Sequence, residues 1–253
     1  MNKYAIVDVK GGLGNQLFTI SFAEYLNQNG YKVLVDTSFY KSSHDHPRVL
    51  NIDIGSFGFK EINFSSDTVF KLLNTRFEEV ENLNYINAKI VNRFKGYYQN
   101  TLFLDKAYLI KKLSLDNKKY PGSVLVHLRR DDYIKLNEEL KLEYYKEAVN
   151  RIEKKLGNFE ISIFSDDHSL KIDDFKNFNV TNIFNDKNSD ALDTFKEMTR
   201  FQNFVISNST FSFLAAFLGE DTSSTIYYPR PWMRNSNVEI KNFPDNWIPL
   251  INK

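Results

Sequence analysis

The sequence predicts an α/β protein with two Rossmann-like lobes whose mostly parallel sheets face each other across a cleft. Strand-like and helix-like segments alternate along most of the chain, and a polar segment containing Pro121-Gly122 interrupts this alternation near the middle. At 253 residues, with 42% hydrophobic residues, the chain is long enough to build two cores. We therefore place an N-terminal lobe at residues 1–118 and a C-terminal lobe at residues 119–253, with a tail that could pack back on the first lobe.

The first lobe opens with a βαβ pattern. Tyr4 to Lys10 predicts a strand, Gly11 to Gly14 a tight turn, and Asn15 to Asn29 a helix that Gly30 caps, before a second strand from Lys32 to Asp36. The first turn of such a helix presents backbone N–H groups without helical partners, which favour an anion.

The same opening is also similar to a dinucleotide-binding fingerprint. Gly12 and Gly14 follow a strand, and Asp36 ends the next strand, where an acid would hold a ribose. Leu17 replaces the third glycine, however, and would hinder close packing of helix on strand. An NAD-dependent oxidoreductase is therefore a disfavoured alternative.

The rest of the first lobe carries weaker signals. The pattern predicts a helix from Ser66 to Thr75, a strand from Lys89 to Tyr98, and a helix from Thr101 to Leu115 with Thr101 as its N-cap. His44 and His46 have no third histidine or cysteine at ligand spacing, so we expect no metal there.

The alternation restarts in the second lobe. The predicted strands are 124–126, 160–164, 179–184, 204–206 and 225–229, and the predicted helices are 142–156, 190–201 and 213–218. The stripe expected to pack helix 142–156 against the core contains Leu142, Tyr145, Val149, Ile152 and Leu156.

Three polar clusters follow strands of this lobe. They comprise residues 129–132, 165–167 and 208–212. Because the carboxyl ends of parallel strands meet at one edge of a sheet, we expect the clusters to line one crevice. Arg129 and Arg130 suit a diphosphate, since each guanidinium offers a planar fork of donors. The alternatives are arginines paired with Asp131 and Asp132 on a solvated turn, and serines that merely cap helices.

Composition excludes several classes of function. With 33 basic and 32 acidic residues the net charge is +1, so no overall field attracts nucleic acid or an anionic membrane. The absence of cysteine excludes disulfides and thiolate metal sites. The N-terminus has no signal pattern, and no apolar run approaches the roughly 20 residues that span a bilayer. We therefore expect a cytoplasmic protein without an integral membrane segment.

Four blocks, in order, resemble the α-1,2-fucosyltransferases of glycosyltransferase family 11. The blocks are Gly11-Gly-Leu-Gly-Asn-Gln-Leu-Phe18, His127-Leu-Arg-Arg-Asp-Asp-Tyr133, Phe164-Ser-Asp-Asp167 and Ser207-Asn-Ser-Thr-Phe-Ser212. The resemblance spans nearly the whole chain. It implies a GT-B fold, a GDP-fucose donor, inversion at the anomeric carbon, and no metal or other cofactor. We therefore expect a glycan acceptor such as O-2 of a terminal galactose. The lack of an anchor or signal pattern further indicates bacterial surface-polysaccharide (O-antigen) assembly, with transient contact at the membrane if the acceptor is lipid-linked.

The resemblance also implies roles for individual residues. Arg129 would bind the β-phosphate and stabilise the charge of the leaving group, and either His127 or Asp132 could act as the base. The residues implied in donor binding are Gly12, Gly14, Asn15, Arg129, Arg130, Ser165, Asp166, Asp167, Asn208, Ser209, Thr210, Phe211 and Ser212. Within this set, Asp166 and Asp167 would address the guanosine, and Ser209 and Thr210 the diphosphate.

Two departures from the family pattern keep other functions open. Asp131 stands where the family usually has glycine, and Phe213-Leu-Ala-Ala216 replaces a Trp-Trp-Gly-Ala run. The first change adds a negative charge beside the expected phosphate site, and the second removes aromatic bulk from a helix behind it. A glycosyltransferase with another nucleotide-sugar donor, or a non-catalytic GDP-sugar-binding protein, is therefore an alternative.

Overall fold

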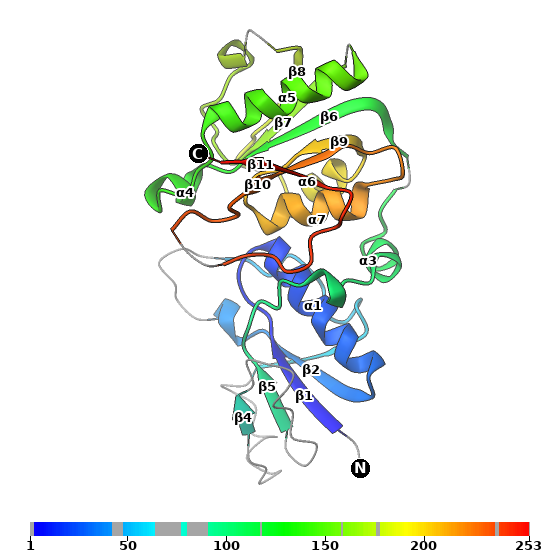
Figure 1. Cartoon of the computed structure of the whole chain (residues 1–253). Helices are drawn as coiled ribbons and strands as arrows, with labels where there is room; N and C mark the ends of the chain where they lie inside the picture. The colour runs from blue at the N-terminus through cyan, green and yellow to red at the C-terminus, as the bar shows by residue number, and fades with distance from the viewer. Residues whose placement is uncertain are drawn as a thin grey trace. The chain divides into compact units, whose positions relative to one another are not determined.

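The computed structural model describes residues 3–41, 48–63, 77–79, 91–116, 118–157, 159–175, 178–235 and 238–252. The chain divides into two compact units, residues 1–113 and 114–253. Each unit is an α/β structure with one parallel sheet, which confirms the predicted fold class (Figure 1). The sequence-based boundary at residue 118 falls in the polar segment before the first strand of unit 2.

Unit 1 is built around a central strand, β1. Its elements are β1 (Lys3–Asp8), α1 (Leu13–Gln28), β2 (Tyr31–Asp36), η1 (Ser38–Lys41), β3 (Lys60–Ile62), β4 (Phe77–Glu79), β5 (Val91–Phe94), η3 (Thr101–Phe103) and α3 (Lys106–Leu113). The sheet has the order β3-β2-β1-β5-β4, and every strand pair in it is parallel. Asp8 pairs in register with Asp36, so the carboxyl ends of β1 and β2 lie level.

The βαβ opening is confirmed, whereas the last predicted helix of unit 1 is wrong at its start. Gly30 follows α1 with a φ of 83°, as a C-terminal glycine should. Residues 101–115 do not form one helix: Asn100 caps the short η3, Leu104 is extended, and Asp105 Oδ1 accepts from the Tyr108 N–H at 2.9 Å. The caps formed by Asn100 and Asp105 therefore divide the segment into two short helices. The helix predicted at 66–75 and the two histidines at 44 and 46 lie outside the described residues.

Unit 2 has a larger parallel sheet. Its elements are β6 (Tyr120–Leu128), α4 (Asp131–Lys135), α5 (Leu142–Leu156), β7 (Ile161–Ser165), η4 (Ile172–Phe175), β8 (Val180–Phe184), α6 (Ala191–Met198), β9 (Phe201–Val205), α7 (Thr210–Gly219), β10 (Ile226–Arg230) and β11 (Ile248–Ile251). The strand order is β11-β10-β9-β6-β7-β8, and the pairs are parallel. The C-terminal strand β11 was not predicted, because Pro249 interrupts a short apolar run at what proves to be the sheet edge.

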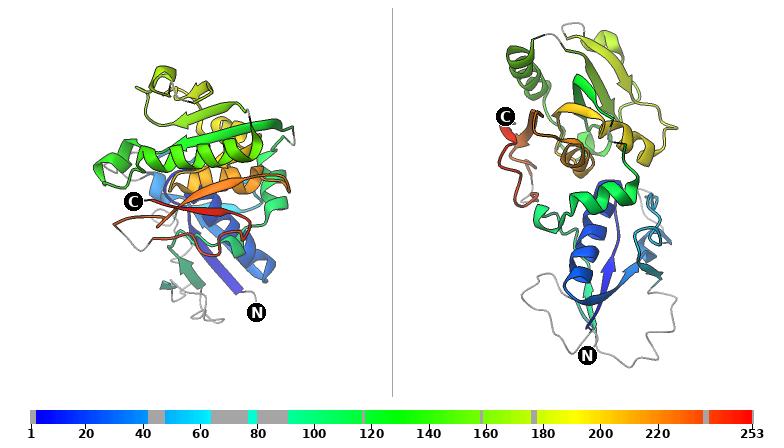
Figure 2. Two further views of the ribbon diagram at one scale, coloured as in Figure 1. Left: turned by 45° about the horizontal axis from the view of Figure 1, so that its top comes forward. Right: turned by 90° about the vertical axis from the view of Figure 1, so that its right-hand side faces the viewer.

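The two faces of this sheet carry different chemistry. Val124, Val126 and Leu128 of β6 belong to the core that α5 covers, while α6 and α7 lie on the other face (Figure 2). Because side chains alternate along a strand, His127 projects toward the face occupied by α7. The fold thus separates an apolar face from one that can hold polar groups.

The stripe predicted for α5 is correct in its middle and wrong at its ends. Tyr145, Val149 and Ile152 are buried, but Leu142 and Leu156 are 42% and 40% exposed. The helix runs past the edge of the core at both ends, and Tyr144 and Ala148 complete the buried face instead.

Helix α7 is buried almost completely, and residues 213–216 all have an exposed fraction of 0%. Phe213 contacts the rings of Trp232, Phe243 and Trp247, with centroids 4.9 to 6.3 Å away. Trp232, Phe243 and Trp247 thus pack aromatic rings against α7, the helix that carries Phe213-Leu-Ala-Ala216 in place of the Trp-Trp-Gly-Ala run.

Gly219 is required where the end of α7 crosses other backbone. A Cβ added there would lie 2.6 Å from the Thr199 carbonyl oxygen and 2.9 Å from the Phe204 ring. We expect Gly219→Ala to lower the free energy of unfolding by about 1–3 kcal/mol, as overpacking does. Chemical denaturation measures this, with Gly55→Ala as the control, because the nearest atom to its added Cβ lies at 3.5 Å. An equal loss in both variants would contradict the steric explanation.

Candidate active site

The carboxyl ends of β6, β7 and β9 bring the three predicted polar clusters together. Leu128 pairs with Ser165, and Val126 pairs with Val205, so the residues after each strand emerge at one edge of the sheet. The Ser165 hydroxyl donates to the Leu128 carbonyl at 2.9 Å and fixes the two strand ends to each other. The predicted convergence is confirmed.

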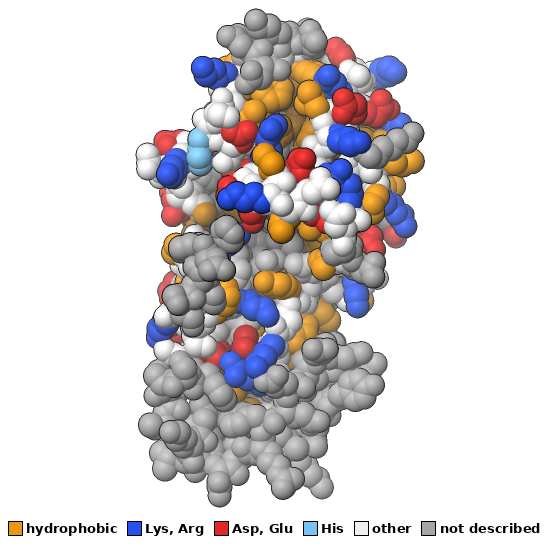
Figure 3. Space-filling view, turned by 90° about the vertical axis from the view of Figure 1, so that its left-hand side faces the viewer, with side chains coloured by type: hydrophobic (Ala, Val, Ile, Leu, Met, Phe, Trp, Pro, Cys, Tyr) orange, Lys and Arg blue, Asp and Glu red, His pale blue; other side chains and the backbone are white. Residues whose placement is uncertain are grey.

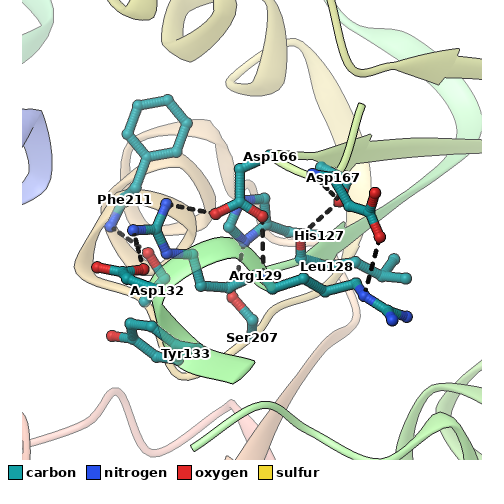
Figure 4. Close-up of polar contacts among 12 residues, drawn as sticks. His127, Leu128, Arg129, Asp132, Tyr133, Asp166, Asp167, Ser207 and Phe211 are labelled. Atoms are coloured by element: carbon teal, nitrogen blue, oxygen red, sulfur yellow. Dashed lines mark hydrogen bonds and ion pairs between the residues drawn. The ribbon is translucent and has the colours of Figure 1, made fainter. Parts of the chain in front are cut away.

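Arg129 is held between two carboxylates. Its Nη2 lies 2.5 Å from Asp132 Oδ1, and its Nη1 lies 2.6 Å from Asp166 Oδ2 (Figure 4). Tyr133 lies beneath the guanidinium, with its ring centroid 5.2 Å from Cζ, and donates its hydroxyl to the Asn208 carbonyl. The side chain of Arg129 is 20% exposed. Two ion pairs and an aromatic face therefore fix the direction in which Arg129 offers its remaining donors.

Arg130 shares the same carboxylate segment. Its backbone N–H donates to Asp166 Oδ1 at 2.8 Å, and its Nε lies 3.1 Å from Asp167 Oδ2. Hydrogen bonds from the side chain and backbone of Ser169, reinforced by the charge of Arg130, lower the pKa of Asp167. Asp167 therefore remains a carboxylate, while Asp166 uses both oxygens to join the ends of β6 and β7.

His127 is buried on the α7 face of the sheet, with an exposed fraction of 6%. Its Nδ1 lies 2.7 Å from the Ser207 hydroxyl, and its ring lies 6.0 Å from that of Phe211. Burial, followed by the positive charge of Arg129, lowers the pKa of His127 from 6.5 to about 3. The imidazole is therefore neutral at physiological pH.

The start of α7 contains the residues expected to bind a diphosphate. Ser209 is its N-cap and accepts from the Phe211 N–H at 3.3 Å, and Thr210 is its first residue. Asn208 and Ser212 are 1% and 0% exposed, and both make hydrogen bonds inside the unit. In this conformation, Ser209, Thr210 and Phe211 are thus more accessible to a ligand than Asn208 and Ser212.

Acidic groups outnumber basic groups at this edge. Asp131, Asp132 and Asp166 each have a carboxylate oxygen within 4.8 Å of the others, and Asp131 is exposed. Arg129 already contacts two of these three carboxylates. The surrounding surface of unit 2 carries acidic and basic side chains that are interspersed (upper half of Figure 3). The site therefore offers directed donors rather than a strong positive field.

The glycine turn of unit 1 is anchored by a residue outside the predicted set. The buried Gln16 donates to the Gly11 and Val49 carbonyls at 3.0 and 2.8 Å and accepts from the Asn51 N–H at 2.9 Å. Gly11 has a φ of 82°, and a Cβ there would lie 2.9 Å from Asn15 Nδ2. The turn thus needs glycine at position 11, and the buried Gln16 side chain fixes its conformation.

The predicted residues Gly12, Gly14 and Asn15 lie at the start of α1. Gly12 is the N-cap of the helix without a side-chain hydrogen bond, and Gly14 is buried in its first turn. Asn15 Oδ1 accepts from Gln99 Nε2 at 2.9 Å. Gln99 lies between β5 and η3, so this contact joins the start of α1 to that connection.

Asp36 has a role that differs from ribose binding. It is 1% exposed, and its Oδ2 lies 2.7 Å from Arg93 Nη2, while Arg93 also contacts both oxygens of Asp8. Burial raises the pKa of Asp8 despite the opposing effect of Arg93. Asp36 is thus part of an internal ion-pair cluster, which removes the main support for the dinucleotide alternative.

Sequence reasoning missed two residues that organise the site. Ser207 is the partner of the His127 ring, and Tyr133 stacks against Arg129. Both residues belong to the sequence blocks quoted above, but the sequence does not show that they contact His127 and Arg129.

The lowered pKa of His127 makes stability depend on pH. The unfolded chain binds this proton near pH 6.5 and the folded chain does not until about pH 3, so its contribution is complete above pH 6.5 and is lost as the pH falls. Between pH 7 and pH 5 we expect a loss of about 2 kcal/mol that His127→Gln does not show. Urea unfolding at both pH values measures it. His168→Gln, which changes an exposed histidine, should behave like the parent protein; the same fall in all three proteins would contradict the assignment.

Among the described residues, no helix combines the length and apolar character needed to cross a membrane.

Comparison with known proteins identifies the family. The model of glycosyl transferase family 11 matches residues 97–250. The chain is 24% identical to the O-antigen biosynthesis glycosyltransferase WbnK of Escherichia coli, over 96% of this chain and 99% of that protein. It is 26% identical to an alpha-1,2-colitosyltransferase of Escherichia coli, over 96% and 97% of the two chains. The fold is similar to that of POFUT1 crystallised with GDP, with a TM-score of 0.50 at 12% identity over 89% of this chain and 98% of that one. The chain is therefore a glycosyltransferase and belongs to glycosyltransferase family 11.

Proposed function

We propose that this enzyme transfers L-fucose from GDP-fucose to a hydroxyl of a glycan acceptor, such as O-2 of a terminal galactose, with inversion and without a metal ion. The observation that carries the proposal is the position of Arg129. Arg129 stands at the carboxyl end of β6. Its ion pairs with Asp132 and Asp166 fix the orientation of its guanidinium before any ligand binds. POFUT1, whose fold is similar, has been crystallised with GDP, which agrees with a GDP-sugar as donor.

Arg129 retains donors for a phosphate. A guanidinium has five N–H groups. One donates to Asp132, and the contact of Nη1 with Asp166 is an ion pair. A phosphate can therefore bind without breaking either ion pair. As the bond between the sugar and GDP breaks, negative charge grows on the β-phosphate, and donors that are already oriented stabilise it without reorganisation.

The start of α7 offers a second set of donors. Ser209 and Thr210 stand at the N-terminus of a ten-residue helix, where backbone N–H groups and the helix dipole favour an anion. Asp167 stays ionised and can accept hydrogen bonds from ribose hydroxyls or from guanine N–H groups. In this proposal Asp166 holds Arg129 and Arg130 rather than contacting the nucleoside.

The acceptor hydroxyl attacks the anomeric carbon from the side opposite GDP and loses its proton. His127 is a weak base because burial and Arg129 lower its pKa, and Asp132 is paired with Arg129. A weak base suffices if the bond to GDP breaks well before the new bond forms, because the hydroxyl becomes acidic only as it bonds to carbon. Both residues therefore remain candidates for this role. In unit 1, Gly12, Gly14 and Asn15 would form the loop that addresses the substrates.

Three rivals have specific support. The relative described as an alpha-1,2-colitosyltransferase favours another sugar on the same type of donor. The carboxylates of Asp131, Asp132 and Asp166 favour either a protein that binds GDP-sugars weakly without turnover, or an enzyme that needs a divalent cation there.

Calorimetric titration tests the donor site. GDP, GDP-fucose, GDP-colitose, GDP-mannose, UDP-galactose and NAD are titrated into the parent protein, with and without EDTA, and into Arg129→Ala and Arg151→Ala. Arg151 is the control because it forms an exposed ion pair with Glu147 on α5. We expect GDP-fucose to bind equally well in EDTA, and Arg129→Ala to lose about 1.5–3 kcal/mol, the usual contribution of a hydrogen bond to a charged group. Arg151→Ala should be unchanged.

Other outcomes identify the rivals. Binding that disappears in EDTA would favour the divalent cation, and tighter binding of GDP-colitose would change the donor sugar. Binding of NAD or UDP-galactose without GDP would reject the donor class. If GDP-fucose binds but no galactoside acceptor is modified, the non-catalytic alternative gains support.

The charge of Asp131 gives a second prediction. Its carboxylate lies near two others, so its removal should lessen repulsion of the diphosphate. We expect Asp131→Asn to strengthen GDP binding by about 0.2–1 kcal/mol at low salt, as for other solvent-exposed charges, and less at high salt. Asp245→Asn removes the same charge from an exposed position outside the cluster and should have little effect. Weaker binding in Asp131→Asn would instead point to a bound cation.

A further inference from the structure

A chain of hydrogen bonds extends from His127 into the interior of unit 2. Nδ1 of His127 lies 2.7 Å from Ser207 Oγ, and Ser207 Oγ lies 3.3 Å from Ser212 Oγ. Ser212 Oγ also lies 3.2 Å from the Ser209 carbonyl and 3.4 Å from the Ser207 carbonyl. His127 is 6% exposed and both hydroxyl-bearing partners are 0% exposed, so the protein itself determines where the hydrogens lie.

Counting hydrogens gives the chain a direction. A carbonyl oxygen can only accept, and each hydroxyl has one hydrogen to donate. If Ser212 donates to a carbonyl, its oxygen accepts from Ser207, and Ser207 then accepts from Nδ1–H of His127. This direction makes three hydrogen bonds. The opposite direction makes two, because Ser212 then donates to Ser207 and no longer to a carbonyl.

The first direction is favoured because buried polar groups are costly when a possible hydrogen bond is not made. It places the hydrogen of the neutral imidazole on Nδ1 and leaves a lone pair on Nε2. Within the described part of the chain, Nε2 makes no hydrogen bond to protein. Burial and the neighbouring Arg129 oppose a second proton on the ring.

We propose that Ser207 and Ser212 are positioning residues that hold His127 as the neutral Nδ1–H tautomer, so that Nε2 accepts a hydrogen bond from a hydroxyl group of a sugar substrate. The link to a sugar rests on the proposed function. No proton is transferred in this role: the hydroxyl donates, and Nε2 accepts. An imidazole of this kind adds no positive charge beside Arg129, so it orients a sugar without competing for the phosphate. Ser212, expected from the sequence to contact the donor, acts here through Ser207.

The tautomer can be measured without any activity. Two-bond correlation spectra of protein labelled with 15N-histidine distinguish Nδ1–H from Nε2–H, and His127→Gln assigns the signal. We expect Nδ1–H in the parent protein and no titration of this ring between pH 5 and pH 8. Ser207→Ala removes the acceptor, and Ser212→Ala frees the Ser207 hydrogen to turn toward Nδ1. Both should increase the Nε2–H form, whereas Ser207→Thr, which keeps a hydroxyl, should not. Ser162→Ala, a buried serine on β7, is the control.

Kinetics then separate positioning from donor binding. We expect kcat to fall about tenfold in Ser207→Ala and Ser212→Ala, the equivalent of one neutral hydrogen bond. The affinity for GDP-fucose should stay unchanged, and Ser207→Thr should restore kcat. An Nε2–H parent protein, a tautomer unaffected by both alanine variants, or weaker GDP binding in Ser212→Ala would overturn the proposal. If GDP-fucose does not bind at all while the tautomer is Nδ1–H, the proposed function fails and the assignment of Ser207 and Ser212 stands.

Discussion

The ion pairs of Arg129 are the interaction on which the site in unit 2 depends. Arg129 follows β6, Asp166 follows β7, and Asp132 belongs to α4, so one guanidinium joins three elements. The carboxylates are only partly buried, at 21% and 22% exposure of their side chains, and each pair contributes modestly to stability. Their main consequence is orientation: a side chain with several rotatable bonds is fixed before any ligand arrives. In the proposed reaction negative charge develops on a leaving phosphate, and there this preorganisation matters more than the strength of either pair.

The parallel sheet provides this arrangement at little cost in chain length. In a parallel sheet every strand ends at the same edge, so short polar segments after β6, β7 and β9 meet although they lie about 40 residues apart in sequence. Alternation along β6 then gives its two faces different roles, with Val126 and Leu128 in the core and His127 on the side of Ser207. The same strand thus carries both the packing and the chemistry.

The periodicity of the chain was sufficient to predict the parallel fold, the helix α5 and the convergence of the three polar clusters at one edge of the sheet. It failed where a local competitor decided the outcome. Asn100 and Asp105 divide a segment that reads as one amphipathic helix, and Pro249 conceals an edge strand. In the site, the sequence indicated which residue types gather but not how they pair. Asp166 was expected to address a nucleoside, and the sequence did not indicate that the register also places it against two arginines. The pairing depends on strand register, which a single sequence does not specify.

Both units place an arginine between two carboxylates at the carboxyl edge of their sheets, yet the consequences differ. In unit 1, Arg93 contacts both oxygens of Asp8 as well as Asp36, and Asp36 is almost fully buried. These three contacts occupy the Arg93 guanidinium at the carboxyl edge of the sheet. Asp36, which fits a dinucleotide fingerprint in sequence, is therefore a structural ion-pair partner. In unit 2, each carboxylate contacts one end of the Arg129 guanidinium, and the Arg129 side chain stays partly exposed. Arg93 directs its guanidinium to carboxylates inside the protein, whereas an arginine held from two sides with donors remaining can bind an anion, so the second arrangement is the one suited to a phosphate.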